Sequence, residues 1–406
     1  MGGVWMDEKS TWPRVGYEEL GRHVDDDDRA LMSKSARRKM GETYYAAVPP
    51  MIAQLTPEVP ADLLRHAMEV ESELIRFDAL LSVRGYDLPA LLLRSESSAS
   101  SRIENLTASV RNVALAELDA TTPRNSREIA GNVRAMREAI ELKGEPSVED
   151  VLRVHASLMS VTGESFGGEL RDEQVWIGGS AFGPQGAAFV PPSQERVPAL
   201  LDDLMAFVRR DDLDPVVQAA VAHAQFETIH PFVDGNGRTG RALLHRWLCY
   251  HDVLRHATLP ISSGLLHDVD SYMGALQSYH DGDVRPIVGE LVNALEVALA
   301  LAQSATRQID DIIERWQEQM GERRGSAIRT LPAVLVAQPV VSVAHVADHL
   351  QITPRAARDV IARACEYGML TPMGNRRRGV FYQADELLDV LEQMTSRPAM
   401  RRMLVR

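Results

Sequence analysis

The chain has 406 residues, and its 44 basic and 57 acidic side chains give a formal net charge of −13. Bulk charge of this sign argues against non-specific nucleic-acid binding, and the length exceeds that of a single small module. A content of 45% hydrophobic and 25% charged residues is that of a soluble globular protein and excludes the disordered and fibrous classes. Two cysteines are too few for a disulfide framework, so we expect a cytoplasmic protein.

We expect neither a signal peptide nor a membrane span. The first 13 residues are interrupted by charged side chains and lack the apolar stretch of a signal peptide. The most apolar helical stretch, residues 291–301, contains Asn293 and Glu296, and it is well short of the roughly 18 apolar residues that a span requires.

Composition and charge divide the chain into regions. Residues 1–40 are predicted to be an N-terminal extension, and residues 41–130 and 131–320 are predicted to be helical. Residues 321–406 hold 13 Arg and 8 acidic residues, a net charge of +5, so the first 320 residues carry −18. A tail of opposite charge predicts a separate module with its own partner.

One stretch interrupts the helical pattern. Two short β-prone runs, 175–177 and 187–190, flank a Gly-rich turn. We therefore expect a hairpin over residues 174–190.

A well-delimited helix precedes the most informative motif. Asp214 and Pro215 form a capping start, apolar residues follow at helical spacing, and Pro231 ends the helix. The string HPFVDGNGRTGR runs from His230 to Arg241 and leads into a second amphipathic helix.

The glycines of this loop favour a phosphate site. Gly235, Asn236 and Gly237 can adopt positive φ and direct successive backbone N–H groups into one concavity at a helix N-terminus, where the dipole favours an anion. Arg238 and Arg241 lie one helical turn apart and can both reach a polyphosphate.

Two further side chains complete the chemistry of the loop. Asp234 places a carboxylate beside the phosphates, which is how proteins commonly anchor Mg²⁺, and His230 supplies a general base. A hydroxyl that attacks phosphorus needs these parts: a cradle, a counter-charge, a metal and a proton acceptor.

Simpler interpretations exist for parts of this pattern. A turn joining two helices would explain residues 235–237 alone, but it does not explain the whole string. His223, Glu227 and His230 share one helical face, as metal ligands can. We interpret His223 instead as a packed or hydrogen-bonded core histidine, and Glu227 as its partner or a surface residue.

The tail, residues 326–395, is predicted to contain two helices and a hairpin. The first helix covers 343–350, and the second starts at Thr353-Pro354 and runs to Gly368. Residues 373–379 are expected at the tip of the hairpin. This order resembles a winged helix-turn-helix with basic residues on its second helix, namely Arg355, Arg358 and Arg363.

The loop resembles the signature of the Fic family. Residues 230–241 match His-Pro-Phe-x-Asp/Glu-Gly-Asn-Gly-Arg-x-x-Arg at every specified position. Fic proteins are helical enzymes that use ATP and Mg²⁺ to transfer AMP to a Ser, Thr or Tyr hydroxyl of a target protein. The resemblance implies a mainly α fold: a Fic core over 131–320 with a β-hairpin flap, followed by the C-terminal winged helix-turn-helix at 326–395.

The resemblance also implies roles for individual residues. His230 would deprotonate the target hydroxyl, and Asp234 would hold Mg²⁺. Asn236 and the neighbouring amides would bind the α-phosphate, while Arg238 and Arg241 would bind the outer phosphates. The implied nucleotide-binding set is Gly235, Asn236, Gly237, Arg238, Thr239, Gly240, Arg241, Tyr272 and His280.

Residues of the predicted hairpin look like the family's flap. This element offers a strand edge to the target segment and so places the target hydroxyl. The residues concerned are Val175, Trp176, Ile177 and Gly178.

An upstream segment fits the family's inhibitory pattern Ser/Thr-x-x-x-Glu-Gly/Asn. The matching residues are Ser100, Glu104 and Asn105, within an inhibitory helix expected at about residues 97–107. The resemblance implies that Glu104 pairs with Arg241 and withdraws it from the γ-phosphate of ATP.

The expected function is protein adenylylation, held low by Glu104, with ATP as substrate and Mg²⁺ as cofactor. One alternative is a de-AMPylase that uses the same site with Glu104 orienting a water. Another is an ATP-sensing DNA-binding regulator, although nucleotide binding alone does not need His230. The expected partner is a target protein, which can be the chain itself, and we expect no membrane partner. A homodimer and DNA binding by the tail stay open.

Overall fold

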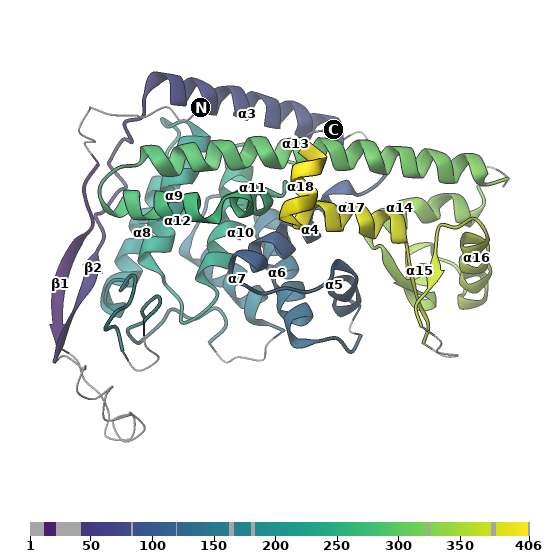
Figure 1. Ribbon diagram of the computed structural model, residues 1–406, viewed down its shortest axis with the longest axis horizontal. Coiled ribbons are helices and arrows are strands. Elements are labelled where there is room, and N and C mark those ends of the chain that lie inside the picture. Colours follow the sequence, from purple (N-terminus) through teal and green to yellow (C-terminus); the bar gives the residue numbers. More distant parts are fainter. Residues whose placement is uncertain are drawn as a thin grey trace, which may run out of the picture.

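A computed structural model describes residues 12–21, 42–82, 84–118, 120–161, 166–179, 183–321, 323, 325–374 and 379–404. Within this part the chain is mainly helical, as predicted, with two small antiparallel sheets (Figure 1). Most of the predicted N-terminal extension, residues 1–11 and 22–40, and the arginines 376–378 of the predicted hairpin tip lie outside the described residues.

The helical body starts at α3 and ends with α13. Several of its helices begin at a polar capping side chain that accepts a backbone N–H: Asp87 for α4, Ser147 for α7 and Asp214 for α9. The helices are α3 (Ala61–Leu81), α4 (Leu88–Ile103), α5 (Val110–Ala116), α6 (Arg124–Glu141), α7 (Val148–Met159), α8 (Val197–Val208), α9 (Pro215–Ile229), α10 (Asn236–Tyr250), α11 (Ile261–His267), α12 (Val269–His280) and α13 (Arg285–Gln319), with a short 3₁₀ turn η1 (Gln194–Arg196) before α8.

Helices α9 and α10 lie at the centre of this body. Oδ1 of Asp214 accepts hydrogen bonds from the N–H groups of Val216 and Val217 at 3.0 and 2.9 Å, which confirms the predicted start of α9. Nearly every residue of α9 is buried, and the helix packs against α3, α8, α10, α12 and α13. Helix α10 also packs on α4, α6 and α7. The loop between α9 and α10 is therefore held by helices on several sides.

Helix α13 spans 35 residues and crosses the length of the helical body (Figure 1). By length and hydropathy alone it could cross a membrane, but 61% of its most apolar window is buried inside the fold. It packs on α3, α9, α11 and α12. Burial of this kind is what a core helix of a globular protein shows.

The N-terminal part contains a sheet that the sequence analysis missed. Strands β1 (Gly16–Gly21) and β2 (Thr43–Val48) pair antiparallel, with Gly16 opposite Val48, so the expectation of helix from residue 41 onward was wrong at its start. The run Thr-Tyr-Tyr-Ala-Ala-Val of β2 is rich in β-prone residues. Strand β2 also bonds to the predicted flap, because the N–H of Ala47 donates to the carbonyl of Val190 at 2.9 Å.

The predicted hairpin at 174–190 is present as a single antiparallel bridge between Ile177 and Phe189. Their backbones are joined by a bond of 2.8 Å from the N–H of Ile177 to the carbonyl of Phe189. Gly178 and Gly179 have φ of 74° and 78°, and a Cβ at Gly179 would come within 2.8 Å of the backbone nitrogen of Ala187. Two glycines are therefore needed where the hairpin closes on itself.

The C-terminal module follows α13; its helices α15 and α16 lie at the opposite end of the molecule from β1 and β2, while α17 and α18 return to pack on α13 (Figure 1). Its three-stranded sheet has the order β3-β5-β4. The elements are η2 (Ala327–Thr330), α14 (Leu331–Ala337), β3 (Val340–Ser342), α15 (Val343–His349), α16 (Pro354–Glu366), β4 (Thr371–Pro372), β5 (Phe381–Gln383), α17 (Asp385–Thr395) and α18 (Arg397–Leu404).

The order of two helices followed by two paired strands agrees with the sequence analysis. Thr353 caps α16, and Arg355 and Arg358 on that helix are exposed. The assignment of this module to the winged helix-turn-helix class remains a prediction. One hydrophobic core is continuous between the module and the helical body.

Candidate active site

The loop between α9 and α10 contains two residues in the left-handed region. His230, at the C-cap of α9, has φ 51° and ψ 62°, and Gly235, at the N-cap of α10, has φ 81° and ψ 7°. Glycine adopts these angles freely, whereas a side chain there costs on the order of 1–3 kcal/mol and persists only where its surroundings hold it. The conformation of His230 is therefore a specific feature of this turn.

The His230 side chain is a neutral base at neutral pH. Burial lowers the pKa of its imidazole to about 4, and the nearby positive charge of Arg171 acts in the same direction, while Glu104 and Asp234 act against it. Nδ1 lies 3.4 Å from the carbonyl of Glu227. A neutral imidazole can accept a proton from a hydroxyl, which is the role predicted for this residue.

The first amides of α10 form the predicted anion cradle, and an acidic side chain already lies against it. These N–H groups have no partner within the helix and carry the positive end of its dipole. A Cβ added to Gly237 would overlap Oε1 of Glu104, so the Glu104 carboxylate lies directly on the Cα of this residue. The glutamate thus lies where a phosphate group would approach the helix.

Arg241 is engaged by the predicted inhibitory pattern. Its guanidinium is buried, with 2% of the residue exposed, and its Nη2 donates to Oε1 of Glu104 at 2.8 Å. Nε donates to Oγ of Ser100 at 2.9 Å, and Nη2 also donates to the carbonyl of Ser100 at 3.0 Å. The structure therefore brings Ser100, Glu104 and Arg241 together as the sequence predicted.

The charge of Glu104 is stabilised in this position. Burial acts to raise the pKa of its carboxyl, but the charge and hydrogen bond of Arg241, with smaller contributions from Arg238 and His230, hold the pKa below its usual range. Glu104 is therefore ionised at neutral pH, and its side chain is still 40% exposed at the open side of the loop.

Asn105 explains the last position of the inhibitory pattern. It follows Glu104 at the end of α4 with φ 62°, in the left-handed region. Its N–H donates to the carbonyl of Arg102 at 3.0 Å. Glycine and asparagine are the residues that tolerate this conformation at a helix end, which gives a physical reason for Gly or Asn after the glutamate.

Asp234 and Arg238 lie at the mouth of the cradle. Oδ1 of Asp234 accepts the N–H of Gly235 at 2.7 Å, and the Asp234 side chain is 62% exposed. Arg238 approaches it through Nη2 at 3.4 Å, a long contact. Within the described residues, no three His, Cys, Asp or Glu side chains gather as a metal site. A single exposed carboxylate beside backbone amides suits a Mg²⁺ ion that takes most of its ligands from phosphate oxygens. It does not suit a metal site made of protein ligands alone.

Three other loop positions have structural roles. The side chain of Asn236 is buried and bonds back to the N–H and carbonyl of Phe232, both at 2.8 Å, so only its backbone is available to a phosphate. Thr239 is fully buried, and a Cβ at Gly240 would come within 2.5 Å of Oε1 of Glu227. The side-chain amide of Asn236 therefore closes the loop, and the implied contact of its backbone with the α-phosphate stays a prediction.

The candidate metal face of α9 is not a metal site. Nε2 of His223 hydrogen-bonds the hydroxyl of Tyr272 at 2.8 Å, which confirms the interpretation of a hydrogen-bonded core histidine. Tyr272 itself is buried, and its place in the implied nucleotide-binding set stays a prediction. Glu227 is half-buried next to Gly240, and desolvation raises the pKa of its carboxyl to about 7.

His280 lies between the body and the flap. Its ring stacks on Phe189 at 4.4 Å between centroids, and Nε2 lies 3.1 Å from the hydroxyl of Thr228. In the flap itself, Ile177 is 39% exposed beside the bridge. These contacts place His280 against the base of the flap, and its place in the implied nucleotide-binding set stays a prediction.

Two functional positions were missed by sequence reasoning. The neutral ring of His155, on α7, accepts the N–H of Gly168 at Nδ1 and bonds the carbonyl of Asp234 through Nε2, both at 3.0 Å. It also stacks on Phe232 at 3.6 Å. Arg171 bonds the loop from the segment before the flap. No motif spacing marks either residue, because their contacts cross 79 and 59 positions of the chain.

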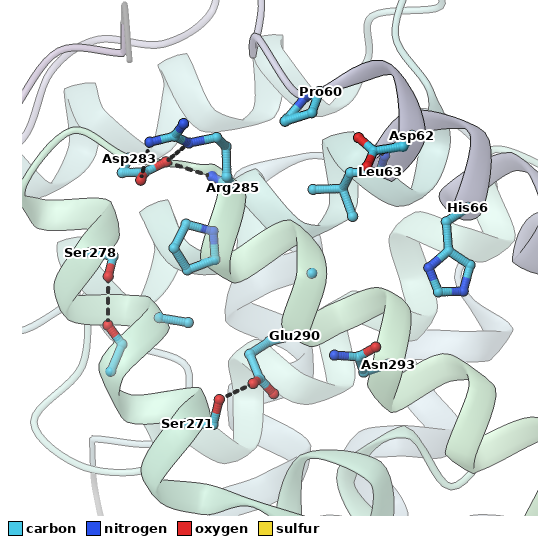
Figure 2. A pocket seen from close by; sticks show the side chains of 14 residues that line it. Pro60, Asp62, Leu63, His66, Ser271, Ser278, Asp283, Arg285, Glu290 and Asn293 are labelled. Atoms are coloured by element: carbon cyan, nitrogen blue, oxygen red, sulfur yellow. Dashed lines mark hydrogen bonds and ion pairs between the residues drawn. The ribbon is translucent and has the colours of Figure 1, made fainter. Parts of the chain in front are cut away.

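A separate cleft of about 660 Å³ lies between α3, α12 and α13 (Figure 2). Its walls include Asp283 and Arg285, which pair with each other, and Ser271, which bonds Glu290. It contains none of the residues of the α9–α10 loop. Two pairs of the polar groups that line it are therefore bonded to each other.

Comparisons with known families agree with this geometry. Residues 145–248 match the Fic/DOC family, and residues 85–141 match the Fic/DOC family N-terminal region. The chain therefore carries a Fic domain, preceded by the N-terminal region of that family, which contains Glu104.

Curated relatives are named for an activity. A protein adenylyltransferase Fic of Drosophila erecta is 30% identical over 206 residues, which cover 48% of this chain and 38% of that protein. One from Aedes aegypti is 31% identical over 163 residues, 40% of this chain and 30% of that protein. The matched part thus spans well under half of the length of these relatives.

A solved structure shows the same fold. A Fic family protein from Desulfovibrio desulfuricans superposes with a TM-score of 0.54 at 22% identity. The match covers 81% of this chain and 97% of the other. The fold similarity therefore extends beyond the Fic domain itself.

Proposed function

We propose that this protein is a protein adenylyltransferase, which transfers AMP from ATP to a Ser, Thr or Tyr hydroxyl of a target protein or of itself. The observation that carries the proposal is the position of neutral His230 at one end of a loop whose other end is an amide cradle flanked by Arg238 and Arg241. The names of the curated relatives support the same activity.

The chemistry follows from these groups. The target hydroxyl oxygen bonds the α-phosphorus of ATP while the bond to the β-phosphate bridging oxygen breaks, and diphosphate leaves with that electron pair. His230 takes the hydroxyl proton. The cradle amides and the two arginines stabilise the phosphate charges. Mg²⁺, anchored by Asp234, would offset the charge of the leaving diphosphate. The edge of the flap beside Ile177 would align the target segment.

We further propose that Glu104 holds this activity low. Arg241 cannot bind the γ-phosphate while its Nη2 is bonded to Glu104 and its Nε to Ser100. The carboxylate also lies against Gly237, where it repels an entering phosphate. ATP would then bind in a pose in which the α-phosphorus is not presented to the hydroxyl.

The experiment that tests the function is labelling with ATP. The Glu104→Gly variant is incubated with Mg²⁺ and α-labelled ATP in lysate, and incorporated label is followed by gel and mass spectrometry. Glu104, with its open side, could also orient a water, which favours AMP removal as a second candidate. Adding the native protein to pre-labelled lysate separates the two, since only a de-AMPylase releases the label as AMP.

We expect Asp234 to set the requirement for Mg²⁺. In the Glu104→Gly background, Asp234→Ala should raise the Mg²⁺ concentration for half-maximal labelling by at least about tenfold, because it removes the exposed carboxylate beside the cradle. The measurement is a Mg²⁺ titration of the labelling rate at fixed ATP. Asp234→Glu, which keeps the carboxylate, is the control and should stay near the parent value. An unchanged titration in Asp234→Ala would remove Asp234 from this role.

A further inference from the structure

Arg171 is a buried arginine held by backbone carbonyls. It is 3% exposed, and among the residues that the structure describes its guanidinium hydrogen-bonds only main-chain oxygens. Nε donates to the carbonyl of His230 at 2.8 Å, and Nη2 also reaches the carbonyl of Ile229 at 3.5 Å. Its own N–H donates to the carbonyl of Pro231 at 3.0 Å. One residue therefore bonds three consecutive positions of the turn that carries the base.

The same guanidinium also bonds both ends of the flap segment. Nη1 donates to the carbonyl of Glu173 at 3.1 Å, just before the flap, and Nη2 donates to the carbonyl of Pro192, just after it. Arg171 thus connects the turn of His230 to the two points where the flap leaves the body.

The chemistry of arginine suits this arrangement. A guanidinium is planar and carries five N–H donors in fixed directions, whereas an ammonium is a point charge on a flexible stem. Burial lowers the pKa of Arg171 to about 10, so the group still keeps its charge and all its donors at neutral pH. Burying a charge without a carboxylate is costly, which indicates that the geometry of these bonds is needed.

We propose that Arg171 is a positioning residue: it holds His230 in its left-handed turn and fixes the distance between this base and the flap that presents the target hydroxyl. This inference rests on the proposed transferase function. A base displaced by about 1 Å can lose on the order of 100-fold in rate while nucleotide binding is unaffected.

Arg171→Lys in the Glu104→Gly background tests the proposal. The maximal labelling rate in a fixed lysate should fall at least about tenfold, with the half-saturating ATP concentration within about twofold of the parent. Arg246→Lys is the matched control, because Arg246 is equally buried and bonds the carbonyl of Gly144 and the side chain of Asp150. The control should keep the parent rate at comparable melting temperature. An unchanged rate in Arg171→Lys, or a loss expressed only in ATP affinity, overturns the proposal.

A second measurement does not depend on activity. Arg171→Lys keeps the positive charge near His230 but loses the planar fork that holds the turn, so the imidazole should become more exposed and the pKa of His230 should rise from about 4. Glu104 and Asp234, the other charges that act on His230, are unchanged. Histidine NMR titration, with His230 assigned by its loss in His230→Ala, follows this shift. A shift without labelling in any variant would reject the transferase and keep the positioning role, whereas an unchanged pKa would reject that role.

An independent set of contacts concerns the inhibitory helix α4. At its start, Arg94 donates to the carbonyl of Ala337 and to Oε1 of Gln338, both at 2.6 Å, and these residues belong to the C-terminal module. At its end, Nη1 of Arg102 donates to the carbonyl of Thr395, the last residue of α17, at 2.7 Å. A cation at a helix C-terminus is favourable because it bonds the free carbonyls and opposes the dipole.

Arg102, which makes this contact, lies two residues before Glu104 in the chain. In the last turn of α4, Ser100 bonds Arg241. Arg102, in the same turn, bonds the end of α17. We infer that the end of α17 restrains α4 in its inhibitory position, so that the C-terminal module contributes to the low activity of the site. This inference too rests on the proposed inhibition by Glu104.

Arg102→Ala in the otherwise native chain should raise labelling by about three- to tenfold, since it removes one charge-assisted bond that holds the inhibitory turn. Arg209→Ala is the control: Nη1 of Arg209 donates to the carbonyl of Pro146 at 3.0 Å, so this variant also loses one arginine–carbonyl bond, but at a place that involves neither α4 nor α17. It should leave labelling unchanged. In the Glu104→Gly background, Arg102→Ala should add nothing. Unchanged or reduced labelling in Arg102→Ala with a native melting temperature contradicts the restraint, as does an equal rise in both backgrounds.

Discussion

Glu104→Gly should raise the labelling of proteins with AMP by a factor of roughly 5–150, the range of couplings of 1–3 kcal/mol. The substitution frees the Nη2 of Arg241 from its bond of 2.8 Å and removes the carboxylate that lies against Gly237. Both changes favour binding of the phosphates of ATP. The first makes the guanidinium of Arg241 available to them, and the second removes the negative charge that occupies the amide cradle. The measurement is the initial rate of α-label incorporation with Mg²⁺, compared with the native chain at equal concentration.

Glu104→Gln separates charge from volume. The amide keeps the size of the side chain, and its oxygen can still accept from Arg241, but it no longer repels phosphate. We expect an activation smaller than that of the glycine variant. If Glu104→Gly incorporates no label into itself or into any lysate protein, the transferase function is rejected.

The loop was predictable because all its chemistry lies within twelve consecutive residues. Neighbouring residues determine the left-handed turn at Gly235 and the start of α10 at Asn236. They also place the arginines of the loop beside its backbone amides. The partner of Arg241 is 137 positions away and was found only through a family pattern. Physical reasoning from Glu104 alone could not have distinguished it from a solvated helix residue.

The contacts that the sequence did not predict have a common cause. The side chain of Asn236 turns back to Phe232, and Tyr272 turns inward to His223, because buried polar groups must find partners inside the fold. Which partner is nearest depends on the packing of helices that are distant in sequence. The same holds for Arg171, whose acceptors come from three segments of the chain. It also holds for β2, whose pairing strand lies on the other side of residues that the structure does not describe.

His230→Ala in the Glu104→Gly background should lower labelling by about 10²- to 10⁴-fold, the contribution of a positioned general base. The substitution leaves the cradle, Arg238 and Arg241 in place, so binding of ATP should be preserved. ATP affinity is measured separately, by equilibrium titration of a fluorescent ATP analogue. Loss of labelling together with loss of nucleotide affinity would mean that the residue holds the loop, and a retained labelling rate would exclude it as the base.

The pH dependence of labelling identifies the state of this base. Burial lowers the pKa of His230 to about 4, so the neutral form that accepts a proton is present above this value and is lost only as the pH falls through it. Glu104 acts to raise that pKa, and its removal in Glu104→Gly therefore moves the acid limb no higher. The labelling rate of this variant should be flat from about pH 5.5 to 8. If His230 were solvated, with a pKa of about 6.5, the labelling rate would fall to half its maximum at a pH of about 6.5. A midpoint near 6.5 in protein that keeps its folded fluorescence would show that His230 works from solvent, and the buried left-handed turn would then not be its catalytic conformation.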